Sequence, residues 1–275
     1  MSYKMIVLDL DDTLLKNDGT ISEKTKKTLK KVQEDGIKVV LASGSPTFAI
    51  EPVANALELE KYGGYIISYN GARIIECRDK KELYAANITR EEVQKLYQMS
   101  QEKDAYIQTY IGDNIIASQP NKFTDIEKQI TGMEIIVPND FSSYVQQEVV
   151  KVIVLQEPEK LKELEKKWKP LIQNKLYMTI SKPFFLEFMN LEVDKGKSIL
   201  RLGKMLGIDA EEIIAIGDSY NDITMIQAAG LGVAMGNAVE AVKEIANYVT
   251  EDNEHDGVAT VVEKFIWEED FALTA

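Results

Sequence analysis

The strongest constraint on the fold is an alternation of short apolar runs with helical segments, present at both ends of the chain. The N-terminal part predicts strands and helices in turn at residues 4–8, 22–35, 37–42, 48–57 and 65–68. The same alternation returns after the middle of the chain, at residues 197–206, 213–216, 221–229 and 232–234. Strand, helix and strand in this order form βαβ units, and strands this apolar are buried on both faces. The sequence therefore predicts an α/β fold with a doubly wound parallel sheet.

The region between these two parts has a different texture. Its strand-like segments are shorter and mixed in polarity, with the first at residues 84–88, and charged helices are predicted at 90–103 and 159–173. Such a pattern is typical of a separate α+β domain. We predict a core of residues 1–79 and 190–275, interrupted by an inserted domain of residues 80–189.

Composition limits the partners of the protein. Asp and Glu number 45 against 32 Lys and Arg, and this net charge of −13 disfavours nonspecific binding to nucleic acid or to an anionic membrane. The single cysteine, Cys77, excludes an intrachain disulfide framework, and the N-terminal segment lacks the pattern of a secretory signal. No apolar stretch reaches the roughly 20 residues that cross a bilayer. We expect a cytoplasmic protein that binds neither nucleic acid nor a membrane.

Two acidic clusters directly follow predicted buried strands. Asp9 and Asp11 end the first strand and lie on one side of it, because side chains two apart in a strand point the same way. Asp218 and Asp222 follow the strand at residues 213–216. Ligands of open α/β sheets bind outside the carboxyl ends of the strands, so both clusters are expected at one edge. Together they suit Mg²⁺, whereas either cluster alone would equally fit a solvated turn or a helix cap.

Two further segments offer groups for an anion. Ser43 and Gly44 follow the strand at residues 37–42, with a hydroxyl and unobstructed amides at the start of a helix. Lys195 opens the helix that follows the insert, where its ammonium could face a phosphate. Each signal is weak alone, because Ser-Gly also marks ordinary turns and most lysines are solvated.

Four motifs occur in a fixed order along the chain. They are DLDDT at residues 9–13, SGS at 43–45, DKGKS at 194–198 and GDSYND at 217–222. This order resembles the haloacid dehalogenase-like hydrolases, and in particular the Cof-type sugar-phosphate phosphatases. The resemblance extends over nearly the whole chain, and it implies that the insert is an α/β cap placed after the third core strand.

The resemblance also implies a role for each motif position. Asp9 would be the nucleophile that forms an aspartyl-phosphate, and Asp11 the general acid to the leaving alcohol and then the base for water. Mg²⁺ would be bound by the Asp9 carboxylate, the Asp11 backbone carbonyl and Asp218, with Asp222 as an outer support. The phosphate oxygens would be held by Ser43, Gly44, Lys195, Asn221 and the amide of Leu10.

Two positions bear on the choice of substrate. Ser45 stands where many Cof-type members have an arginine, so a bidentate contact to an anionic or polyol substrate is lost. Asn70 lies in a segment that resembles a family loop facing the cap, which makes it a candidate substrate contact, although asparagine is equally typical of an ordinary turn.

These observations predict a Mg²⁺-dependent phosphatase of small phosphorylated metabolites, such as sugar phosphates. A phosphotransferase or phosphomutase would use the same intermediate and pass the phosphoryl group to a sugar hydroxyl. A phosphoacceptor signalling module would instead keep its phosphorylated aspartate. The long insert and the second acidic cluster disfavour that alternative, since such a module needs only one small domain.

Overall fold

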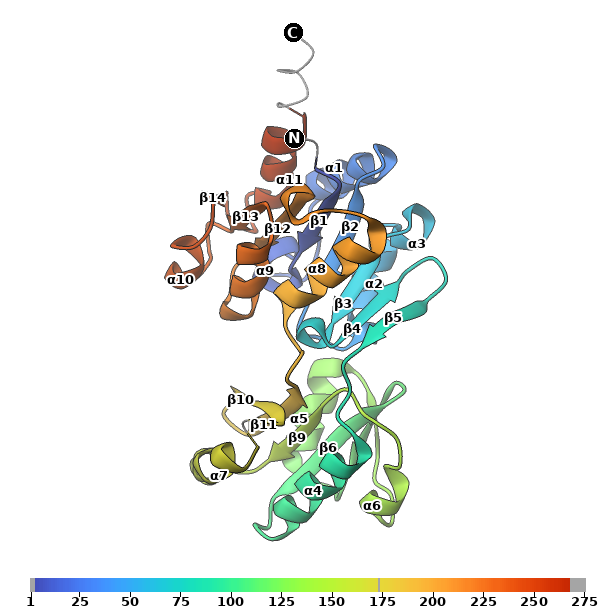
Figure 1. The fold of residues 1–275 in the computed structure, drawn as a ribbon, viewed down its shortest axis with the longest axis vertical. Helices are drawn as coiled ribbons and strands as arrows, with labels where there is room; N and C mark the ends of the chain where they lie inside the picture. The colour runs from blue at the N-terminus through green and yellow to red at the C-terminus, as the bar shows by residue number, and fades with distance from the viewer. Residues whose placement is uncertain (1–2, 173, 268–275) are drawn as a thin grey trace. The chain divides into compact units, whose positions relative to one another are not determined.

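The chain divides into two compact units. The computed structural model describes residues 3–172 and 174–267. The core holds residues 3–84 and 194–267, and the insert holds the described residues between 85 and 193. The sequence placed the boundaries at residues 79 and 189, and residues 1–2 and 268–275 of the predicted core lie outside the described residues. Figure 1 shows the blue and orange-red parts of the chain in the first unit and the green and yellow parts in the second.

An eight-stranded sheet forms the centre of the core, in the order β14-β13-β12-β1-β2-β3-β4-β5. Its strands are β1 (Met5–Leu8), β2 (Lys38–Ala42), β3 (Tyr65–Ser68), β4 (Arg73–Glu76), β5 (Lys81–Ala85), β12 (Ile213–Gly217), β13 (Leu231–Ala234) and β14 (Tyr248–Val249). The strands from β14 to β3 are parallel, and β4 runs antiparallel to β3. Because β1 pairs with β2 on one side and β12 on the other, the two ends of the chain share one sheet. The predicted doubly wound fold is confirmed.

One strand prediction is wrong. The segment at residues 84–88 was expected to be a strand of the insert, but the structure has β5 at Lys81–Ala85, beside β4 in the core sheet. A turn at residues 77–80 returns the chain to the edge of the sheet. The alternation of strands and helices could not reveal this step, because no helix separates β4 from β5.

Helices complete the core, and a side chain caps the start of two of them. They are α1 (Glu23–Glu34), α2 (Thr47–Ala56), α3 (Leu59–Tyr62), α8 (Lys195–Leu206), α9 (Ile223–Ala228), α10 (Glu240–Lys243) and α11 (Gly257–Val262). The Ser22 side chain caps α1 by accepting a hydrogen bond from the Thr25 amide at 3.0 Å. The Asp194 carboxylate accepts from the Lys197 amide at 2.7 Å, so α8 begins at Lys195. No helix within the described ranges is both long and apolar enough to cross a membrane.

The central strands are buried along their whole length. All four residues of β1 have no exposed surface, and they belong to one apolar core with side chains of α1, α2, α8, α9 and α11. A strand with apolar side chains on both faces is stable only in a sheet whose two faces are both covered. Burial therefore places β1 among the central strands of the sheet. Asp9, the first polar residue after β1, must then lie at the carboxyl end of this strand, along the edge where the parallel strands end.

The insert has a sheet and an apolar core of its own. Its sheet has the order β10-β11-β9-β6-β7-β8, and it is mostly antiparallel. The strands are β6 (Tyr106–Ile111), β7 (Asn114–Ala117), β8 (Glu134–Ile136), β9 (Val152–Leu155), β10 (Leu176–Lys182) and β11 (Phe185–Asn190), and the helices are α4 (Arg90–Gln101), α5 (Lys122–Thr131), α6 (Phe141–Tyr144) and α7 (Pro158–Ile172). Trp168 of α7 packs against Phe188 in this core, with 6.1 Å between the ring centroids. The predicted end of this helix, Gln173, lies outside the described residues.

Candidate active site

The pairing of β1 with β12 brings the two acidic clusters together. The strands are parallel with Leu8 opposite Ile216, so their carboxyl ends lie side by side. The Asp9 amide continues the ladder by donating to the Ile216 carbonyl at 3.0 Å. Asp9 and Asp218 therefore leave the sheet at the same edge, as their places after buried strands predicted.

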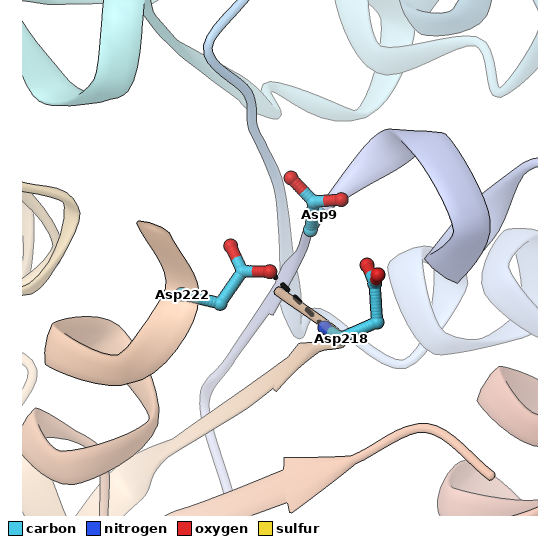
Figure 2. A group of neighbouring side chains, drawn as sticks. All are labelled: Asp9, Asp218 and Asp222. Atoms are coloured by element: carbon cyan, nitrogen blue, oxygen red, sulfur yellow. Dashed lines mark hydrogen bonds between the residues drawn. The ribbon is translucent and has the colours of Figure 1, made fainter. Parts of the chain in front are cut away.

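Three buried carboxylates form a cluster at this edge. Asp9, Asp218 and Asp222 each place one oxygen within 4.8 Å of the others, and their exposed fractions are 6%, 9% and 0%. Figure 2 shows the three side chains gathered in one place, with Asp9 at the end of β1 and the other two after β12. Carboxylates this close repel one another unless a cation or hydrogen bonds compensate them. Their hard oxygen atoms are suited to a divalent cation such as Mg²⁺, so this cluster could hold a metal ion.

A buried lysine already compensates part of this charge. Lys195 is 1% exposed, and its Nζ lies 2.6 Å from Oδ1 of Asp9 and 2.6 Å from Oδ1 of Asp222. The solvated position that most lysines occupy is thus not the one found here. Removing the lysine would leave two carboxylates without a cation away from water, which is strongly unfavourable.

Burial controls the protonation of the cluster. It raises the pKa of Asp9 well above its ordinary value, against the opposing effect of Lys195, and the Asp222 and Asp218 carboxylates raise it further. Burial also raises the pKa of Asp218 to about 6, although a hydrogen bond from Thr13 opposes the change. For Lys195, burial lowers the pKa, but the facing Asp9 and Asp222 carboxylates outweigh it and hold the pKa above its ordinary value. Protons and a metal ion would therefore compete for these carboxylates.

Asp222 also shapes the loop that carries Asp218. Its Oδ2 accepts hydrogen bonds from the amides of Asp218 and Ser219, both at 3.0 Å. Gly217 leaves room for this contact, because a Cβ at that position would lie 2.6 Å from the Asp222 Cγ. The Thr13 hydroxyl donates to Oδ1 of Asp218 at 2.8 Å, which joins the loop to the segment after β1.

The chain turns sharply after Asp9. Asp11 is extended, with φ −66° and ψ 130°, whereas Asp12 has a left-handed conformation with φ 59°. Both side chains are exposed, and the Asp11 carboxylate accepts no hydrogen bond from any described residue. Asp11 thus lies outside the buried cluster, at the open side of the site.

A pocket of about 260 Å³ opens above these loops. It is lined by Asp9, Asp11, Asp12, Ser43, Gly44, Ser45, Asp218, Ser219 and Asn221. The structure therefore brings most of the predicted site residues to one cavity. Lys195 and Asp222 lie behind it, in contact with Asp9 and Asp218. The Leu10 side chain is buried, so the group of Leu10 that was predicted for the site is its backbone amide, next to Asp9.

The remaining predicted residues lie in the loops after β2 and β3. Oγ of Ser43 accepts from the Ser45 amide at 3.0 Å, so its hydroxyl hydrogen stays available to another acceptor. The Ser43 carbonyl accepts from the Asn70 amide at 2.9 Å. Asn70 then accepts from Nδ2 of Asn221 at 3.1 Å, and a Cβ on Gly44 would lie 3.1 Å from its Oδ1. Asn70 thus connects the loops of Ser43 and Asn221.

Two residues that shape the site were missed by sequence reasoning. Thr13 bonds to Asp218, and Nδ2 of Asn237 donates to the Asp12 carbonyl at 2.7 Å. Thr13 belongs to the first motif, but its residue type gave no direct sign of a partner more than 200 positions away. Asn237 follows the strand predicted at residues 232–234. This position beyond the carboxyl end of a parallel strand is where site residues are expected, and it could have identified Asn237 as a candidate.

Comparison with known proteins places this fold and site in a family. The family model for haloacid dehalogenase-like hydrolases matches residues 6–262. A Bacillus subtilis relative, 5-amino-6-(5-phospho-D-ribitylamino)uracil phosphatase YcsE, is 30% identical over 272 residues, which cover 97% of this chain and 97% of the relative.

Solved structures agree with this assignment. A haloacid dehalogenase-like hydrolase from Bacteroides thetaiotaomicron is 40% identical, with a TM-score of 0.89 over 96% of this chain and 99% of that one. The HAD subclass IIB sugar phosphatase BT4131 is 27% identical, with a TM-score of 0.78 over 95% of this chain and 98% of that one. This protein belongs to the haloacid dehalogenase-like hydrolase family. The resemblance seen in the four motifs is confirmed, and at the level of the family so is the prediction of an enzyme of the phosphatase class.

Proposed function

We propose that the protein is a Mg²⁺-dependent phosphatase that hydrolyses phosphate monoesters of small metabolites through an aspartyl-phosphate. The observation that carries this proposal is the meeting of Asp9, Asp218 and Asp222 with Lys195 at one edge of the core sheet. Relatives named as phosphatases of a phosphorylated ribitylamino compound and of sugars support the substrate class. We also propose that the protein acts in the cytoplasm.

The metal would be held by the carboxylates of Asp9 and Asp218 and by the backbone carbonyl of Asp11, with Asp222 supporting the Asp218 loop. The donors on side chains are hard oxygen atoms, and the two carboxylates are the number that Mg²⁺ typically takes from a protein. When bound, the cation would stabilise negative charge on the transferring phosphoryl group.

Each step of the reaction is assigned to a residue of this chain. An Asp9 oxygen forms a bond to phosphorus while the bond from phosphorus to the ester oxygen breaks. Asp11, on the open side of the pocket, gives its proton to that leaving oxygen and later takes a proton from the water that attacks the aspartyl-phosphate. Lys195 orients Asp9 through its 2.6 Å contact.

The phosphate itself would be bound by the polar groups around the pocket. The Ser43 hydroxyl and the Gly44 amide lie at the pocket, in the loop that leads into α2. The first amides of a helix are not used by the helix itself and attract anions. Asn221 and the amide of Leu10 would bind further phosphate oxygens. Asn70 is held against these loops and would contact the rest of the substrate.

A substrate screen tests the proposal. Purified protein is incubated with sugar phosphates, nucleotides and phosphorylated cofactors, with Mg²⁺ or with EDTA, and inorganic phosphate is measured. We expect phosphate release from one substrate class and only with Mg²⁺. Formation of an isomeric sugar phosphate without free phosphate would identify a phosphomutase, and a stable phosphoprotein without turnover would identify a signalling module.

The metal-free protein should lose stability around the cluster as the pH rises. The folded state raises the pKa of Asp218 from 3.8 to about 6, so it keeps a proton that the unfolded chain has released. Stability from this proton is present below pH 4 and is lost as the pH rises through 6. The test compares melting temperatures in EDTA at pH 4 and pH 7. The difference obtained by subtracting the value of the natural protein from that of Asp218→Asn should be larger at pH 7, because only the natural protein loses this stability.

Mg²⁺ should reverse this trend in the natural protein. At pH 7.5 the cation binds the ionised carboxylates and raises the melting temperature, whereas at pH 4 protons occupy them and the effect is small. Asp218→Asn should show little response to Mg²⁺ at either pH. Equal stabilisation of the natural protein at both values would contradict a metal site at these carboxylates.

A further inference from the structure

A short segment after β13 contacts both of the loops that carry acidic residues. Nδ2 of Asn237 donates to the Asp12 carbonyl at 2.7 Å, and the Val239 amide donates to the Asp218 carbonyl at 3.0 Å. One stretch of backbone thus fixes the turn after β1 and the loop after β12. The proposed reaction has so far given this segment no role.

The turn after β1 needs such support. Asp12 has φ 59° and ψ 7°, a conformation that costs a residue with a side chain on the order of 1 kcal/mol. The Asp11 carboxylate is exposed and receives no hydrogen bond from the described residues. Its direction therefore depends on the backbone of the turn, and the Asp12 carbonyl belongs to the second peptide group after the Asp11 Cα.

Asn237 is itself held in one orientation. Its Oδ1 accepts a hydrogen bond from the backbone amide of Asn253 at 3.2 Å, so its Nδ2 faces the Asp12 carbonyl. The Asn253 side chain donates to the Leu15 carbonyl at 3.0 Å, at the end of the same turn. Two asparagine side chains thus each donate a hydrogen bond to a carbonyl of the turn, and the backbone of Asn253 also donates to the side chain of Asn237.

We infer that Asn237 is a positioning residue for Asp11. By holding the Asp12 carbonyl, it keeps the Asp11 carboxyl group where its proton reaches the leaving oxygen while Asp9 bonds to phosphorus and the ester bond breaks. This inference rests on the proposed phosphatase function. It predicts that loss of Asn237 harms most the substrates whose leaving group needs that proton.

The test compares two esters with different leaving groups. The alkoxide of glycerol 2-phosphate is a poor leaving group and needs protonation, whereas the nitrophenolate of p-nitrophenyl phosphate leaves with little help. For Asn237→Ala with Mg²⁺ we expect kcat/KM to fall about 10-fold or more with glycerol 2-phosphate and less than about 3-fold with p-nitrophenyl phosphate, since general acids typically contribute about 100-fold or more. The ratio kcat/KM is used because it excludes the later hydrolysis of the aspartyl-phosphate.

Asn247→Ala is the matched control. Oδ1 of Asn247 accepts from the Gly232 amide at 2.8 Å, so this variant loses one bond between an asparagine side chain and the backbone, at the opposite end of β13 from the site. Asn237→Ala loses two such bonds. The control should lower the melting temperature and leave the ratio of the two kcat/KM values unchanged.

Asn237→Asp distinguishes the loss of the hydrogen-bond donor from the loss of side-chain volume. It keeps an acceptor for the Asn253 amide but cannot donate to the Asp12 carbonyl when ionised. Its added charge acts on both esters alike, so the same selective loss is expected. An equal fall for both esters, or no fall, in a folded variant would overturn the role of Asn237 and leave the phosphatase proposal standing. Failure of the natural protein with Mg²⁺ to release phosphate from these two esters and from every substrate of the screen would overturn both.

Discussion

Replacing Asp9 by asparagine is expected to abolish hydrolysis while leaving the fold intact. Asparagine has the same shape, and its Oδ1 can still accept from Lys195, but its amide cannot attack phosphorus. Loss of a catalytic nucleophile typically lowers turnover by a factor of about 10⁴ to 10⁶. The variant should still bind Mg²⁺ through Asp218 and the neighbouring carbonyl. The measurement is phosphate release from the best substrate of the screen, together with the melting temperature and Mg²⁺ titration calorimetry.

Asp18→Asn provides the comparison for Asp9→Asn. Asp18 is exposed in the same loop, and its carboxylate accepts two hydrogen bonds from Thr20, two residues along the chain. This variant should keep its activity. Substantial turnover by pure Asp9→Asn protein would refute the assignment of Asp9 as the nucleophile, even if the screen shows Mg²⁺-dependent phosphatase activity.

Lys195→Met should have the largest effect on stability. The substitution keeps the apolar stem of the side chain but removes the ammonium that lies 2.6 Å from both Asp9 and Asp222. Two buried carboxylates are then left without a cation, and breaking a buried ion pair in this way costs about 3–5 kcal/mol. The free energy of unfolding, measured with urea in EDTA at neutral pH, should fall by about this amount. Hydrolysis should also fall sharply, because Asp9 loses the group that orients it.

A second substitution distinguishes charge from packing. In Lys195→Met/Asp222→Asn one of the two facing carboxylates is neutral, so part of the lost stability should return although activity does not. Stability of Lys195→Met equal to that of the natural protein in EDTA would show that the ion pairs contribute nothing to the fold. No recovery in the double variant would assign the loss to packing.

The centre of the site could be predicted because it depends on the sheet alone. The apolar runs before Asp9 and Asp218 predict buried parallel strands, and such strands end at a common edge. The meeting of these two residues follows from that geometry, despite the long insert between them. The positions of Ser43 and Asn221 at the same pocket follow in the same way.

Other parts of the site depend on contacts that no local pattern reports. Lys195 meets Asp9 across 186 positions of sequence, and its direction is set by the place where Asp194 starts α8. Asn237 contacts Asp12 because the segment after β13 reaches the turn after β1, although β12 separates the two strands in the sheet. The strand predicted at residues 84–88 was misplaced for a related reason, since the short turn before β5 leaves no change of periodicity to detect.

The order of the strands also has a consequence for synthesis on the ribosome. β2 emerges soon after β1, but β12, the other neighbour of β1, begins at Ile213, after the whole insert has been translated. Until then one apolar edge of β1 has no native partner, and open edges of this kind promote association between nascent chains. The insert is continuous in sequence and can collapse around its own core in the meantime. The carboxylates and the lysine therefore come together only late in translation, and a prematurely terminated chain would lack the assembled reactive centre.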